Sequence, residues 1–272
     1  MIMSKTSRRT TLRLLTCGTL ALSFALALPA PGEALAEELP PPEDPRFVTA
    51  LLDQIDDMHR GDSSHGLMQM KVQTKHWTRS MAMETWSLGE KRSLVRILEP
   101  KKERGTATLK VEDDLFTYLA KTGRTIKITG AMMGGSWMGS HFTNDDLVKG
   151  TRLAEDFETT VKDGPVTAGE PTYALTLVAK PDAPVVWGKI EIIVRKSDLM
   201  PARETFYDED GEALRLLEFS EYRTVDNRSF PVRMRMTPLD KPGEFTEIRY
   251  AKMEFNAGLT RDFFSLQRLK SL

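Results

Sequence analysis

Two short polar stretches contain the residue types that enzymes and metal sites use. Ser63 to Gly66 reads SSHG and places a hydroxyl next to a histidine, but it lacks the G-x-S-x-G pattern that exposes a nucleophile. Tyr207 to Glu212 reads YDEDGE, with acidic residues at calcium-like spacing but without the later ligands of a calcium loop. Its Asp-Gly pair favours a hairpin. We therefore expect turns at both stretches and no catalytic residue.

The four histidines are scattered along the chain. They are His59, His65, His76 and His141, and none has the H-E-x-x-H spacing of a zinc site, although ligands distant in the sequence could still meet in the fold. The formal net charge is −1, so no basic excess attracts nucleic acid. The sequence therefore predicts no metal, no cofactor and no nucleic-acid partner.

Methionine carries the more informative signal. Twelve of the fourteen methionines lie beyond residue 36, and the thioether side chain adapts to variable apolar partners, although core packing explains any single methionine as well. Gly130 to Val148, GAMMGGSWMGSHFTNDDLV, places Met132, Met133, Trp137 and Met138 on a glycine-rich backbone outside any strand pattern. This stretch predicts a mobile apolar flap that covers an apolar ligand.

A short helix is expected at the end of the same stretch. Thr143 followed by Asp146 resembles a capping box, with Asp in place of the commoner Glu. Phe142 and Leu147 then occupy the two positions of a hydrophobic staple. The pattern predicts that this helix is part of the cover.

Residues 1–36 have the features of a cleavable signal peptide. Basic residues precede an apolar run, and ALA at Ala34 to Ala36 supplies a peptidase site. SRRTTL resembles a twin-arginine motif without its aromatic residue, so the general and the twin-arginine export routes both remain open. Thr16 and the continuing apolar run argue against lipidation of Cys17, the only cysteine. Either route leads out of the cytoplasm.

The rest of the chain changes period once. The proline-rich residues 37–45 predict an exposed tether, and Phe47, Leu51, Ile55 and Met58 then recur at helical spacing. From Gly66 onward the period is two, as in IEIIVR and VRMRM. Turn signals separate the runs at SLGEK, LEPKKERG, VEDD, KTGR, VKDGP, YDEDGE, VDNRS and PLDKPGE. We expect one domain over residues 46–272, with about ten to twelve antiparallel strands curved into a barrel or half-barrel.

Four stretches match the motifs of a known family. They are Met58 to Met70 (MHRGDSSHGLMQM), Leu94 to Lys110 (LVRILEPKKERGTATLK), Phe116 to Ile128 (FTYLAKTGRTIKI) and Ser136 to Val148 (SWMGSHFTNDDLV). Together they resemble the LolA-type outer-membrane lipoprotein-sorting proteins, in the branch often found beside multispanning lipid exporters. His141 stands where that branch usually has Asp, and Ala120 where Pro is common.

The resemblance implies a mainly β fold with a few helices: a strongly curved antiparallel half-barrel, an incomplete β-barrel, covered by a helical lid. It implies a non-catalytic periplasmic carrier or acceptor that binds lipid or lipoprotein acyl chains in an apolar cavity for transport towards the outer membrane. A multispanning inner-membrane lipid exporter is the implied partner. The expected lipid-binding or lid residues are Leu51, Ile55, Met132, Met133, Trp137, Met138, Phe142 and Leu147.

Two other functions remain open. A non-catalytic periplasmic adaptor that docks on a lipid exporter would have a closed sheet interior with no room for an acyl chain. A periplasmic hydrolase would need a nucleophile motif, and the sequence offers isolated His and Asp residues instead. The size of the cavity and its occupancy distinguish the carrier from the adaptor.

Overall fold

The structure, a computed structural model, describes residues 39–149, 153–183 and 185–271. The expected signal peptide, Cys17 and the first two residues of the expected tether lie outside the described residues. Residues 38–272 make up one compact unit. None of the helices in the described ranges combines the length and the apolar character that a bilayer crossing requires.

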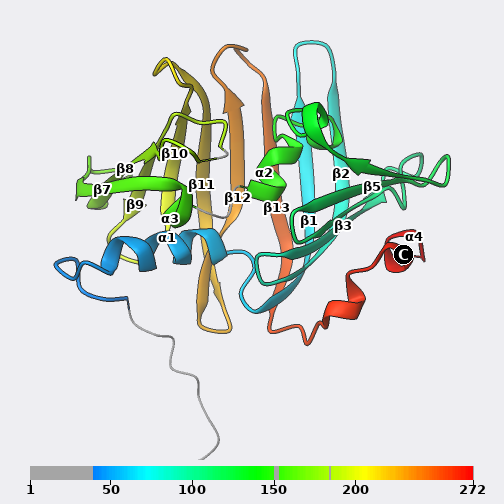
Figure 1. The fold of residues 1–272 in the computed structure, drawn as a ribbon, viewed down its shortest axis with the longest axis horizontal. Helices are drawn as coiled ribbons and strands as arrows, with labels where there is room; N and C mark the ends of the chain where they lie inside the picture. Colours follow the sequence, from blue (N-terminus) through cyan, green and yellow to red (C-terminus); the bar gives the residue numbers. More distant parts are fainter. Residues whose placement is uncertain (1–38, 150–152, 184, 272) are drawn as a thin grey trace, which may run out of the picture. The chain divides into compact units, whose positions relative to one another are not determined.

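Thirteen strands and four α-helices make up the described fold (Figure 1). The strands are β1 (Ser63–Gln73), β2 (Thr78–Leu88), β3 (Arg92–Glu99), β4 (Ala107–Val111), β5 (Asp114–Leu119), β6 (Arg124–Ile128), β7 (Phe157–Asp163), β8 (Thr172–Ala179), β9 (Lys189–Arg195), β10 (Pro201–Tyr207), β11 (Ala213–Val225), β12 (Arg228–Pro238) and β13 (Phe245–Phe255). The helices are α1 (Phe47–Asp57), α2 (Asn144–Lys149), α3 (Leu153–Asp156) and α4 (Leu266–Ser271), with 3₁₀ turns η1 (Gly130–Met132), η2 (Trp137–Gly139) and η3 (Arg261–Phe263).

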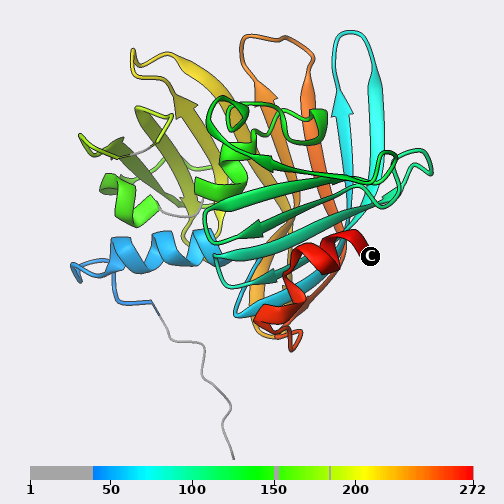
Figure 2. The same cartoon turned by 45° about the vertical axis from the view of Figure 1, so that its right-hand side comes forward.

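All thirteen strands belong to one antiparallel sheet, in the order β6-β5-β4-β3-β2-β1-β13-β12-β11-β10-β9-β8-β7. Pairing of β1 with β13 joins the two halves of the sheet. The two edge strands are β6 and β7, and because they do not pair with each other the sheet stays open. They are consecutive along the chain. The connection between these edges contains η1, η2, α2 and α3, and α2 lies in front of the central strands (Figures 1 and 2). The expected antiparallel half-barrel with a helical cover is confirmed.

The turn signals of the sequence were accurate, and the strand count was slightly low. All eight turn stretches fall between consecutive strands, and YDEDGE forms the β10–β11 hairpin, in which the Glu212 amide donates to Asp208 Oδ1 at 2.8 Å. Four consecutive residues of β4 are buried. The reason is that the sheet is covered on both faces there, which removes the alternation by which strands are recognised.

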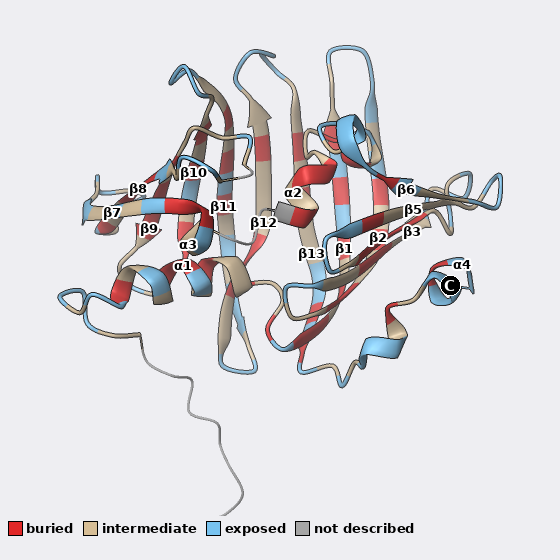
Figure 3. Cartoon of the chain, in the orientation of Figure 1, coloured by how far each residue is buried: buried red, intermediate tan, exposed pale blue. Residues whose placement is uncertain are grey.

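The two faces of the sheet are covered by different helices. On α1, Phe47, Leu51, Leu52 and Ile55 are at most 3% exposed and pack with residues of β7 to β12. At the other end of the chain, Leu269 of α4 packs against the face of β2 to β4 that does not carry the α1 cluster. Figure 3 shows the resulting bands of buried residues along the strands. Each fully buried apolar side chain of this kind contributes about 1.5–3 kcal/mol.

Candidate functional site: an apolar cavity with a polar cluster

A cavity of about 350 Å³ lies between the sheet, α1 and the lid segment, by which we mean Gly130–Val148. This volume is within the roughly 300–1,000 Å³ of small-molecule sites. The strands contribute most of its apolar wall. The apolar lining residues include Ile55 and Met58 of α1, Trp137, Phe142 and Leu147 of the lid segment, and Ile190, Phe206, Leu217, Phe219, Met234, Met236 and Ile248 of the sheet.

The structure brings four of the eight expected site residues to the cavity wall: Ile55, Trp137, Phe142 and Leu147. Leu51 lies in the core cluster beneath α1, and Met138 packs beside Trp137 against the residues of β1 and β2. Met133 packs with Leu147 against Leu115, Ile128 and Val148. Met132 is 45% exposed and does not line the cavity. The lipid-binding role of these eight residues stays a prediction.

Hydrogen bonds define the conformation of the lid segment. The Trp137 indole is 4% exposed, and its Nε1 donates to Thr108 Oγ1 at 3.1 Å. The Ser140 hydroxyl donates to the Trp137 carbonyl at 2.7 Å. Gly130 and Gly139 have φ angles of +51° and +71°, which favour glycine. The glycines expected to make a pliable flap therefore include two that are required by turn geometry.

The capping box expected at α2 is present. The Thr143 amide donates to Asp146 Oδ2 at 2.7 Å, and the Asp146 amide donates to Thr143 Oγ1 at 3.2 Å. Phe142 and Leu147, the expected staple, both pack against the cluster that contains Trp137. A local sequence pattern thus fixes the beginning of the helix that lies over the cavity.

His141, where the family resemblance departs, connects the lid segment to β13. Its amide donates to Thr246 Oγ1 at 3.0 Å, and its Nδ1 lies 2.9 Å from the same oxygen. Its Nε2 lies 3.2 Å from Glu244 Oε2. A histidine here therefore keeps the lid segment attached to the central strands.

A buried ion pair attaches α2 to the other half of the sheet. Arg215 of β11 donates from Nη1 and Nη2 to the two carboxylate oxygens of Asp146, at 2.8 and 2.6 Å. The guanidinium carbon also lies 4.1 Å from the ring centre of Trp187 and 4.5 Å from that of Phe206. Planar stacking and two parallel hydrogen bonds are the geometry that arginine provides and lysine does not.

Besides Asp146, the carboxyl groups of Asp145, Glu204 and Asp56 line the cavity, and the last two are perturbed by burial. Burial, with a smaller contribution from the neighbouring Asp56, raises the pKa of Glu204 to about 8, against the effect of Arg215. Burial likewise raises the pKa of Asp56 to about 7, against the effect of Arg60 and of the hydrogen bond from the Leu153 amide. Loss of solvation is the dominant cause for both groups. The apolar cavity therefore has one acidic corner.

The wall near the end of α1 is polar and contains the Arg60 guanidinium beside the rings of His59 and Tyr250. His59 Nε2 lies 2.9 Å from the Pro231 carbonyl, and its ring stacks on Tyr250 at 4.9 Å. Burial lowers the pKa of His59 to about 4 and raises the pKa of Tyr250 to about 12. Both rings are therefore neutral near pH 7.

The SSHG stretch is the start of β1 and not the expected turn, and it does not form a nucleophile–base pair. The Ser64 hydroxyl bonds to the His59 carbonyl at 3.1 Å and to the Ser87 hydroxyl at 2.7 Å. His65 Nε2 lies 2.9 Å from Glu84, and its ring stacks on Trp86. Successive residues of β1 point to opposite faces, which separates the hydroxyl from the imidazole. Among the described residues, no group of three or more His, Cys, Asp or Glu side chains could hold a metal ion.

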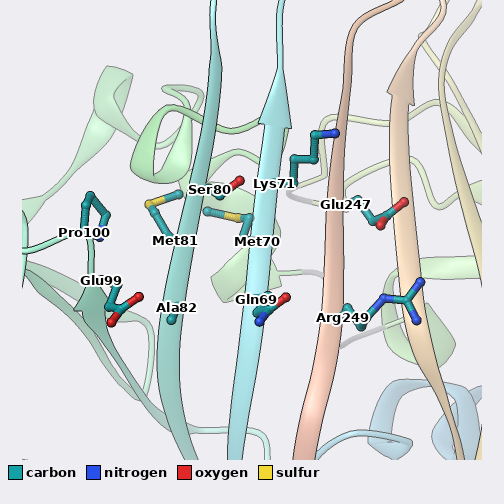
Figure 4. Close-up of a pocket in the computed structure, with 10 residues that line it drawn as sticks. All are labelled: Gln69, Met70, Lys71, Ser80, Met81, Ala82, Glu99, Pro100, Glu247 and Arg249. Atoms are coloured by element: carbon teal, nitrogen blue, oxygen red, sulfur yellow. The ribbon is translucent and has the colours of Figure 1, made fainter.

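Another depression, of about 370 Å³, lies over β1, β2 and β13 (Figure 4). Lys71, Glu99, Glu247 and Arg249 are among the residues that line it. Charged side chains keep such a surface hydrated, so it offers little driving force for an acyl chain. We therefore assign the candidate site to the cavity under the lid segment.

Sequence reasoning missed the acidic corner, although a signal was present. Glu204 lies two residues from Phe206 on β10, and Arg215 lies two residues from Leu217 on β11. A period of two places each charged residue on the same face as its apolar neighbour. A charged residue at a strand position where the alternation predicts an apolar one is the pattern that could have identified Glu204 and Arg215.

Comparisons with solved structures identify the fold. The chain is similar to a domain from Vibrio parahaemolyticus named as outer membrane lipoprotein-sorting, with 23% identity and a TM-score of 0.70 over 80% of this chain and 97% of that one. It is similar to a DUF1329 family protein from Desulfovibrio piger, with 21% identity and a TM-score of 0.72 over 82% and 98%. A LolA superfamily protein from Nitrosomonas europaea shares 21% identity at a TM-score of 0.67 over 81% and 98%. The resemblance seen in the sequence is thus confirmed as a LolA-like fold.

The sequence comparisons add a family. No curated protein matches the chain. Residues 89–271 match the model of a family described as "Uncharacterized protein". That match covers more than half of the chain, and the chain therefore belongs to this family.

Proposed function

We propose that the protein is a non-catalytic carrier or acceptor that binds lipid or lipoprotein acyl chains in the cavity under α1 and the lid segment. The observation that carries the proposal is the apolar wall formed by both layers, with Leu217 and Met236 from the sheet and Trp137 and Phe142 from the lid segment. Burial of apolar surface contributes about 25 cal/mol per Å², without any bond being made or broken. The LolA-like fold supports the same function.

The carrier works in the periplasm and moves its cargo towards the outer membrane, with a multispanning inner-membrane lipid exporter as its partner. The signal-peptide pattern of residues 1–36 supports export. The lipoprotein-sorting domain of similar fold supports this direction of transport.

Native mass spectrometry of the exported protein, purified without detergent, tests the proposal. We expect a stoichiometric acyl-chain adduct, which organic extraction then identifies. In titrations with acyl chains of increasing length, each added methylene contributes about 0.8 kcal/mol, or about fourfold in affinity, until the cavity is full. A protein that stays bare after incubation with membrane lipids would overturn the carrier function and support the adaptor.

A cavity-filling pair of variants locates the bound chain. Leu217→Trp fills the cavity from β11, whereas Glu218→Trp places the same side chain on the exposed face of that strand. We expect the first variant to lose the adduct and the second to retain it, with thermal unfolding confirming that both are folded. Equal occupancy in both variants would place the chain elsewhere.

A further inference from the structure

Glu204 is a carboxyl group on the apolar face of β10. In the sheet it lies between Ile192 of β9 and Leu217 of β11, both of which are buried. Phe206, two residues further on, shares its face. The whole residue is 9% exposed, and it lines the cavity. The side chain is therefore directed into the space proposed for the ligand.

No protein group in the described ranges satisfies this carboxyl with a hydrogen bond or an ion pair. Arg215 is close, because it lies diagonally across the β10–β11 ladder, but both of its terminal nitrogens bind Asp146. Asp56 accepts a hydrogen bond from the Leu153 amide at 3.3 Å. Arg215 and Asp56 thus each have a hydrogen-bond partner other than Glu204.

A buried carboxyl group without a partner is stable only in its neutral form, because an isolated charge costs far more in an apolar site. In that form it has one O–H donor and retains acceptor capacity. A buried donor left unused costs about 1–3 kcal/mol. At Glu204 the cavity therefore offers a hydrogen-bond donor that a ligand can satisfy.

We propose that Glu204 is the polar subsite of the cavity and donates a hydrogen bond to the uncharged carbonyl oxygen of an acyl ester or acyl amide. This inference rests on the proposed function and adds the chemical class of the ligand. An ammonium group has no lone pair with which to accept a hydrogen bond, and a carboxylate or phosphate at this position would be repelled by Asp56 and Asp146. An ester or amide carbonyl accepts a hydrogen bond without adding charge.

Three ligands of equal heavy-atom count test the subsite: methyl dodecanoate, N-methyldodecanamide and pentadecane. Their affinities are measured by displacement of the uncharged dye Nile red from the wild-type protein, Glu204→Gln and Glu204→Leu. The affinity for the ester or the amide, divided by the affinity for pentadecane, should be about three- to tenfold higher in the wild-type protein than in Glu204→Leu, and this difference is the preference that the test measures. Glu204→Gln keeps a neutral donor and should keep the preference. Glu204→Leu should remove it, with pentadecane bound at least as tightly as by the wild-type protein.

The outcomes separate this inference from the proposed function. If the ester-to-pentadecane and amide-to-pentadecane affinity ratios are the same in the wild-type protein and in Glu204→Leu, the subsite is wrong and the carrier function stands. If neither the probe nor any ligand binds the wild-type protein, both are wrong. A preference for the ester alone or for the amide alone identifies which linkage the cargo carries.

Discussion

Asp146, a capping residue of α2, forms an ion pair with Arg215 of β11. The carboxylate receives the Thr143 amide and both terminal nitrogens of Arg215, across 69 positions in the sequence. The side chains are 16% and 8% exposed. The helix over the cavity is therefore held at its N-terminus by a group that starts the helix and attaches it to β11.

Breaking this pair should be costly. Asp146→Asn leaves the Arg215 guanidinium buried without its counter-ion, and we expect the free energy of unfolding to fall by about 3–5 kcal/mol. Urea denaturation measures the change. Asp163→Asn, which removes an exposed carboxylate paired with Lys196, is the matched control and should cost less than about 1 kcal/mol.

The same pair makes a prediction about coupling. The double variant Asp146→Asn/Arg215→Met removes both charges, so its loss should be clearly smaller than the sum of the two single losses. Losses that simply add would show that the two side chains do not stabilise each other.

Thr143→Ala should lower the free energy of unfolding by about 0.5–2 kcal/mol, because the Asp146 amide loses its side-chain acceptor at the first turn of α2. Thr143→Ser retains the hydroxyl and should recover most of this loss. Hydrogen exchange at the amides of α2 should be faster in the alanine variant alone. Equal exchange rates in both variants would show that the Thr143 hydroxyl does not stabilise the start of α2.

Trp137→Ala should lower both stability and ligand occupancy. The indole is buried against Met70 and Val95 and donates to Thr108, so its removal should cost about 3–5 kcal/mol. Trp77→Ala is the control, since Trp77 is 43% exposed. Unfolding in urea and native mass spectrometry provide the two measurements. Unchanged occupancy in a folded Trp137→Ala protein would exclude Trp137 from the site.

Stability should fall as pH rises above about 4.5. Burial raises the pKa of Glu204 to about 8 in the folded protein, and of the charged groups near it Asp56 and Asp146 raise this pKa while Arg215 lowers it. The folded state therefore binds a proton that the unfolded state releases, and each pH unit between the two pKa values costs up to about 1.4 kcal/mol. Glu204→Gln cannot titrate and should show a flatter dependence in denaturation from pH 5 to 9. An identical slope in both proteins would contradict the assignment.

The local features of this protein were predictable because nearby residues encode them. The Thr143–Asp146 capping box, the Asp210-Gly211 hairpin and the alternation of Ile190, Ile192 and Val194 all depend on residues a few positions apart. Conformational preference and burial on one face act at that range, so sequence patterns reproduce them.

The site depended on contacts that no local pattern contains. Because β1 pairs with β13, β6 and β7 become the two edges of the sheet. The lid segment follows β6 in the chain and therefore lies in the connection between these edges. The register of β10 on β11 then places Glu204 near Arg215, and Arg215 meets Asp146 from a distant part of the chain. The sequence by itself determined the strands, the turns and the cap, because their energetics are local. Tertiary structure alone decided which side chains share the cavity, because that choice is made by strand pairing and burial between residues far apart in sequence.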